Sequence, residues 1–123
     1  MLGQRVRLAH LPVFLVGGAM MMACGGTAPP QTQMTAAQSA VRAAEVGGAE
    51  ELPKGKLHLK YARDQIQEAT ALMEQKEYEQ AERVLLRAEV DAKYALGVAQ
   101  HEEARLEAEE LLESIDALME GTK

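Results

Sequence analysis

The pattern of apolar positions predicts two long amphipathic helices in the second half of the chain. In the first helix, apolar residues recur at alternating spacings of three and four, which places them on one helical face. They are Leu59, Ala62, Ile66, Ala69 and Met73. After a short polar interruption at 74–77, the same spacing continues through Tyr78, Ala81, Leu85, Ala88, Ala92, Ala95 and Ala99. Two helices joined by so short a connection are expected to lie antiparallel, apolar face against apolar face.

The apolar stripe changes phase after Ala99. The later members, Ala104, Ala108, Leu111, Ile115 and Leu118, keep the spacing, but the step from Ala99 to Ala104 is five residues. Such a step moves the apolar face around the helix. Because no proline or glycine lies between Ala99 and Glu120, one helix is expected over about 77–119, roughly 60 Å long. It is longer than its partner helix can cover, so Leu111, Ile115 and Leu118 form a candidate partner face.

A weaker, alanine-rich pattern predicts a third helix upstream, over about 35–46. Thr35 and Gln38 have the spacing of a capping box at a helix start, and Gly47 and Gly48 end the helix. The segment Leu52-Pro53-Lys54-Gly55 is a second break, so the next helix is expected at about 56–75. The predicted fold is therefore all-α, an antiparallel helical hairpin or three-helix bundle with a long C-terminal helix, over residues 35–123.

The first 23 residues differ in character from the rest. They contain Arg5 and Arg7, no acidic residue, an apolar run over 11–22, and small Ala23 at the end. These features are typical of a secretory signal peptide. The apolar run is short for a membrane span, which needs about 20 residues, although a retained membrane anchor is the alternative. Residues 24–34, with Pro29 and Pro30, are expected to form a short disordered tether.

Cys24 is the only cysteine in the chain. The run Met21-Met22-Ala23-Cys24-Gly25 resembles the lipobox of bacterial lipoproteins, with Met21 in place of the commoner leucine. The resemblance implies that the Cys24 thiol receives a diacylglycerol, that the signal peptide is cut before Cys24, and that the new amino terminus is acylated. Gly25 stands where an aspartate would retain the protein at the inner membrane, which implies the periplasmic face of the outer membrane. A free thiol and an intermolecular disulfide are the alternatives.

The charge of the exported part argues against two classes of partner. After Cys24 there are 11 basic and 19 acidic residues, a formal charge of −8. Nucleic-acid binding and peripheral binding to anionic lipid both need a basic surface, so neither is expected. Much of the acid lies in the last helix, with eight acidic and two basic residues from Glu102 onward.

No motif in the sequence indicates catalysis or a metal centre. The run His101-Glu102-Glu103-Ala104-Arg105 begins like a helical zinc signature, but Arg105 stands where the second histidine is needed. His58 is isolated from other metal-ligating residues. Ser39 and Ser114 lie in no glycine-flanked turn of the kind that exposes a nucleophile. We therefore predict no enzyme, no catalytic or metal-binding residue, and no cofactor besides the lipid on Cys24.

Residues from about 36 to 100 resemble the bacterial family called domain of unknown function 4398. The resemblance rests on Ala62-Arg63-x-x-Ile66-x-x-Ala69, Lys76-Glu77-Tyr78-Glu79-Gln80-Ala81 and Leu85-x-x-Ala88-x-x-x-Ala92. The Tyr-x-x-Ala element is also similar to the second helix of a tetratricopeptide repeat. The resemblance implies a short helical module of exported lipoproteins, sometimes found beside peptidoglycan-binding domains of the OmpA type. The family has no assigned activity.

These observations together predict a lipid-anchored helical binding or scaffolding module of the cell envelope. Its expected partners are the membrane, through the lipid, and either another envelope protein or a second copy of the chain. The alternative is a structural tether between the outer membrane and peptidoglycan. It rests on Lys123, because some helical lipoproteins of similar outline are joined to peptidoglycan through a terminal lysine.

Overall fold

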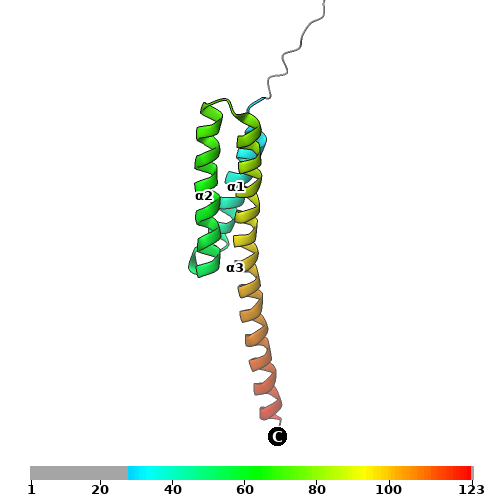
Figure 1. Ribbon diagram of the computed structural model, residues 1–123. Helices are drawn as coiled ribbons and strands as arrows, with labels where there is room; N and C mark the ends of the chain where they lie inside the picture. Colours follow the sequence, from blue (N-terminus) through cyan, green and yellow to red (C-terminus); the bar gives the residue numbers. More distant parts are fainter. Residues whose placement is uncertain (1–27, 123) are drawn as a thin grey trace, which may run out of the picture.

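The computed structural model describes residues 28–122, and this part of the chain is helical with no strand. Its elements are α1 (Gln31–Val46), the short 3₁₀ helix η1 (Ala49–Glu51), α2 (Pro53–Glu74) and α3 (Tyr78–Gly121). α2 and the first half of α3 form an antiparallel hairpin, and α1 packs against both (Figure 1). The predicted all-α fold with a long C-terminal helix is confirmed.

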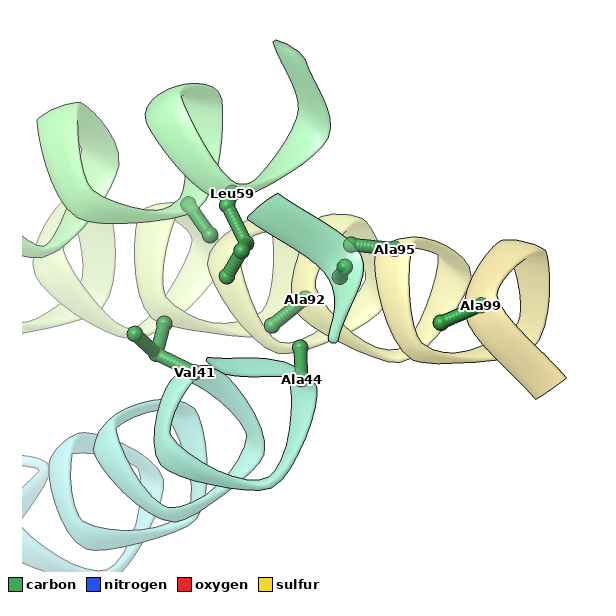
Figure 2. Packing of buried hydrophobic residues seen from close by; sticks show 8 residues of the cluster. Val41, Ala44, Leu59, Ala92, Ala95 and Ala99 are labelled. Atoms are coloured by element: carbon green, nitrogen blue, oxygen red, sulfur yellow. The ribbon is translucent and has the colours of Figure 1, made fainter. Parts of the chain in front are cut away.

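The two predicted stripes form the core between α2 and α3. Every predicted α3 position from Ala81 to Ala99 is buried, and Leu59 and Leu85 are the largest fully buried side chains. Figure 2 shows the core cluster near η1 and labels residues from all three helices. They are Val41, Ala44, Leu59, Ala92, Ala95 and Ala99. Because most of these side chains are alanines, the helices pack with little apolar volume between them.

α1 completes the bundle by burying one narrow stripe. Its buried residues are Ala37, Val41 and Ala44, spaced four and three apart. Arg63 of α2 fixes the end of this helix: its Nε and Nη2 atoms donate to Glu45 Oε1 at 3.2 and 2.6 Å, and Nη2 also donates to Glu50. The bonds to Glu50 and Glu45 raise the pKa of the Arg63 guanidinium. Arg63, which belongs to the run Ala62-Arg63-x-x-Ile66-x-x-Ala69, therefore connects α2 to the end of α1 and to η1.

The predicted start of the first helix at residue 35 is wrong. α1 begins at Gln31, directly after Pro30, and the Met34 amide donates to the Pro30 carbonyl at 3.0 Å. Thr35 lies inside the helix, where its hydroxyl donates to the Gln31 carbonyl at 3.0 Å. A threonine can bond to the carbonyl four residues earlier inside a helix as well as cap a helix start. The spacing of Thr35 and Gln38 therefore does not by itself identify the first residue of α1. Residues 31–34 are helical and do not belong to a tether.

The predicted second break at 52–55 is also displaced, since α2 begins at Pro53 and not at 56. Proline suits the first helical position because its missing N–H has no partner to lose there. Gly55 is buried in the first turn, and a Cβ atom built on it would lie 2.3 Å from the Ala49 carbonyl oxygen. The glycine is needed for close contact between α2 and η1 and does not break the helix.

The turn between α2 and α3 is a tight helix-ending motif. The Glu77 amide donates to the Leu72 carbonyl at 2.9 Å, and the Lys76 amide donates to the Met73 carbonyl at 3.0 Å. This is the Schellman pattern, which requires a left-handed residue after the helix cap. Lys76 occupies that position with φ 62°, a conformation that costs free energy in any residue with a Cβ atom.

α3 is twice as long as the bundle it helps to form. With 44 residues it spans about 66 Å at 1.5 Å per residue. Its last buried residue is Ala99, and the remainder, residues 100–121, projects past the other helices (Figure 1). This segment is called the tail below. Within it Arg105 pairs with Glu102 and Glu109, and the hydrogen bond from Arg105 lowers the pKa of Glu102 below its ordinary 4.5.

Candidate functional site

The predicted partner face lies on the tail. Leu111, Ile115 and Leu118 are 62%, 43% and 71% exposed, and their spacing of four and three puts them on one side of α3. Ala104 and Ala108 continue the same side toward the bundle. Cys24, the predicted lipid-attachment residue, lies outside the described residues.

The apolar face of the tail points away from α1 and α2. The five-residue step from Ala99 to Ala104 rotates the stripe by about 140° at 3.6 residues per turn. The opposite side of the tail carries Glu103, Leu106 and Glu110, which line a groove together with residues of the α1–α2 connection. The tail therefore presents its acidic side toward the bundle end and its apolar side outward.

The apolar outer face begins inside the bundle, which sequence reasoning missed. Val90, Tyr94, Gly97 and His101 are all exposed and continue the spacing of the tail stripe backward without a break. We call this row the outer seam. It consists of Val90, Tyr94, Gly97, His101, Ala104, Ala108, Leu111, Ile115 and Leu118. The signal was present in the sequence, but Gly97 and His101 are not apolar enough to be counted in a stripe.

Two grooves are lined in part by residues of the seam. The larger, of about 590 Å³, runs between the start of α2 and the middle of α3. Its walls are Leu52, Pro53 and Lys54 on one side and Tyr94, Gly97, Val98, His101 and Glu102 on the other. The smaller, of about 290 Å³, is lined by Leu86, Arg87, Val90 and Asp91. Both are open and shallow, which suits a side chain from another molecule better than an enclosed small ligand.

A polar cluster joins α2 to α3 on the flank of the bundle. His58 Nδ1 and Asp91 Oδ1 are 2.8 Å apart, and Gln65 Nε2 donates to Asp91 Oδ2 at 2.9 Å. The His58 ring lies 4.3 Å from the Tyr94 ring and meets the Tyr61 ring edge-on at 5.7 Å. The cluster is half-buried and bridges the two helices, so it fixes the register of α2 along α3.

The two serines of the described residues lie away from this cluster. Ser114 lies on the tail, where its hydroxyl donates to the Leu111 carbonyl at 2.7 Å, and Ser39 lies on α1 beside a separate groove. Within residues 28–122, no three His, Cys, Asp or Glu side chains gather in an arrangement that could hold a metal ion. The same residues contain no helix that is both long enough and apolar enough to cross a membrane.

The fold and the outer seam define a class of protein: a small three-helix module with one helix projecting beyond its own core. Residues 32–111 match the family described as a domain of unknown function, DUF4398. The match covers more than half of the chain, so the chain belongs to this family. It includes the bundle from the second residue of α1 onward and the tail as far as Leu111. No curated protein matches the chain, and no solved structure matches it.

Proposed function

We propose that this protein is a lipid-anchored helical scaffold of the bacterial cell envelope, which binds its partner through the outer seam of α3. The observation that carries the proposal is the seam itself. Half of α3 has no cover within the described chain. Its exposed Leu111, Ile115 and Leu118 lie on one face, with Leu112 beside them, whereas Leu106 lies on the opposite side. A contiguous exposed apolar face is typical of a protein interaction site.

The anchoring part of the proposal rests on the signal-like segment and the lipobox around Cys24. Two or three acyl chains on one residue hold a protein on a membrane stably, whereas one chain binds reversibly. From Cys24 to Gln31 there are seven residues, which reach at most about 25 Å when extended. The start of α1 would thus stay close to the membrane surface, on the periplasmic face of the outer membrane.

The arrangement of the helices fits this orientation. The start of α1 lies beside the turn between α2 and α3 (Figure 1), where Gln33 Nε2 donates to Glu82 Oε1 at 2.9 Å. The tail leaves the opposite end of the bundle. An anchor before α1 therefore directs the tail away from the membrane, with its apolar face accessible along its length.

A test of anchoring compares the full chain with its Cys24→Ser variant in bacterial cells fed a labelled fatty acid. We expect the parent to carry the label in the outer-membrane fraction, and the variant to lose both the label and the membrane association. Thr27→Ser, a conservative change outside the lipobox, serves as the control and should behave like the parent. A parent chain without label, or a variant that stays on the membrane, would overturn the proposed anchoring.

A test of binding places a photoreactive residue at Ile115 in intact cells, with Glu113 as the matched control on the other side of the tail. Cross-linking to an identified protein at Ile115 and not at Glu113 supports the seam as the binding surface. Equal products at both positions, or none at Ile115, would refute it.

A tether to peptidoglycan is the second candidate function. It is favoured by the distance between the two ends of the module, since α3 alone spans about 66 Å and its end lies far from the start of α1 (Figure 1). Its test is mass spectrometry of the chain after muramidase digestion. A muropeptide on Lys123, lost in Lys123→Arg, would establish the tether, and an unmodified Lys123 would exclude it.

A further inference from the structure

The outer seam has the repeat of a coiled-coil interface. Its nine positions follow spacings of four and three throughout, from Val90 to Leu118, so they occupy the alternating a and d positions of a heptad. In the tail, Ile115 falls at an a position and Leu111 and Leu118 fall at d positions. In a parallel coiled coil, a β-branched residue at a and leucine at d favour two strands over three or four.

The charges of the tail are distributed as such a pair requires. Of its eight acidic residues, seven lie away from the seam, at positions b, c and f of the same heptad: Glu102, Glu103, Glu109, Glu110, Glu113, Asp116 and Glu120. Only Glu107 flanks the seam, at a g position. In a parallel pair a g residue faces the following e residue of the partner, which is Leu112. Two copies of this acidic helix can therefore associate without placing carboxylates opposite each other.

The area of the seam is sufficient for a specific dimer. The seam covers 29 residues, or about 43 Å of helix. A helix with its side chains is about 10–12 Å in diameter. If each copy covers a third of the surface of its partner's helix along this length, the two copies together bury roughly 1,000 Å². That is the size at which specific interfaces begin. Leu112 and Met119 at e positions, both exposed, and the two shallow grooves beside the seam widen the contact.

We infer that the outer seam is covered by a second copy of this chain, in a parallel, in-register dimer. Identical residues meet across the dimer axis, Leu111 with Leu111 and Ile115 with Ile115. The two bundles lie side by side and the two tails form a two-stranded rod with an acidic exterior. The parallel direction also rests on the proposed anchoring, because two chains held at the same membrane through short N-terminal tethers must point their tails the same way.

The test uses the full chain in isolated membranes, with single cysteines introduced at positions that differ only in their side of the tail. Leu111→Cys and Ile115→Cys lie in the seam, and Glu110→Cys and Glu113→Cys lie opposite. All four positions are exposed, so the substitutions leave the core unchanged. The parent, whose only cysteine is Cys24, gives the background. After mild oxidation, the products are separated by mass without reduction.

We expect Leu111→Cys and Ile115→Cys to shift from the mass of one chain to that of two, because residues at the same a or d position come within the distance that a disulfide requires. Glu110→Cys and Glu113→Cys should remain at the parent's background. Equal dimer on both sides of the tail, or none in the seam, overturns the inference.

A second pair of single-cysteine variants tests whether the two helices of the dimer are parallel or antiparallel. In an antiparallel coiled coil a positions meet d positions, so Leu111 would lie near Tyr94 of the other copy. Leu111→Cys and Tyr94→Cys, co-expressed with different tags, should give only same-residue disulfides if the dimer is parallel. A mixed disulfide as the main product would overturn the parallel arrangement.

The same cysteines separate this inference from the proposed function. The lipid label on the parent reports anchoring, while the seam cysteines, also placed in the Cys24→Ser background, report association without the anchor. A seam dimer without a lipid label on the parent refutes the anchoring and retains the dimer. A labelled parent without a seam dimer retains the anchoring and refutes the second copy as the partner.

Discussion

Replacing Gly55 and Gly97 by alanine should change stability in opposite directions, although both glycines are helical. Alanine is favoured over glycine in a helix interior by about 1 kcal/mol. At Gly97 nothing lies within 4 Å of the added Cβ atom, so this gain is realised. At Gly55 the Cβ atom would lie 2.3 Å from the Ala49 carbonyl oxygen, and backbone atoms cannot move aside as a flexible side chain can. Overpacking of this kind costs about 1–3 kcal/mol and exceeds the propensity gain.

The assay is thermal unfolding followed by far-ultraviolet circular dichroism at two protein concentrations, because self-association raises Tm by mass action. At the lower concentration we expect Gly97→Ala to melt above the parent and Gly55→Ala below it. The difference between the two variants, about 1–3 kcal/mol, corresponds to a separation of roughly 4–24 °C in Tm. If Gly55→Ala is as stable as the parent, α2 does not pack on η1 as described. If Gly97→Ala is less stable, the outer face of α3 is not free.

The remaining predictions concern the core, the turn and the tail. Leu85→Ala should lower the free energy of unfolding by about 2–5 kcal/mol because it empties a fully buried site, whereas Leu57→Ala, at a 45% exposed site, should cost less than about 1 kcal/mol in the same urea titration. Lys76→Gly should raise the urea midpoint, since glycine adopts φ 62° without the penalty of roughly 1 kcal/mol carried by other residues; no rise would mean that the turn has another conformation. The Glu102 carboxyl should titrate below 4.5 by nuclear magnetic resonance and return to that value in Arg105→Gln. Its depressed pKa means that the pair stabilises the tail above pH 4.5 and that this contribution is lost as the pH falls below it; an unchanged midpoint in Arg105→Gln would contradict the pairing.

The core of the fold could be predicted because spacing alone determines which residues share a helical face. The rows from Leu59 to Met73 and from Ala81 to Ala99 line the contact between α2 and α3. The starts of α1 and α2 are predicted less well, because the sequence pattern assigns Pro29 and Pro30 to a tether and residues 52–55 to a break. In α2 the deciding fact is the contact of Gly55 with η1, which only the tertiary structure shows.

The candidate site was predicted only in part, for a related reason. Leu111, Ile115 and Leu118 are large and apolar, so their spacing was evident in the sequence. Val90 and Tyr94 lie on the same face of α3 but within the stretch dominated by the alanine stripe of the core. Only their exposure in the folded chain distinguishes the outer face from the inner one.

The two stripes of α3 differ in side-chain size, and this difference separates their roles. The inner stripe consists mainly of alanine, which allows α1 and α2 to approach closely but buries little apolar area per residue. The outer seam has its small residues, Gly97, Ala104 and Ala108, around the end of the bundle. In the tail beyond them it has large aliphatic side chains, Leu111, Ile115 and Leu118. Most helical stability in proteins comes from packing of an apolar face, so the tail gains most from a partner where its side chains are largest. The part of α3 that contributes nothing to the core of its own chain is therefore the part best suited to bind another.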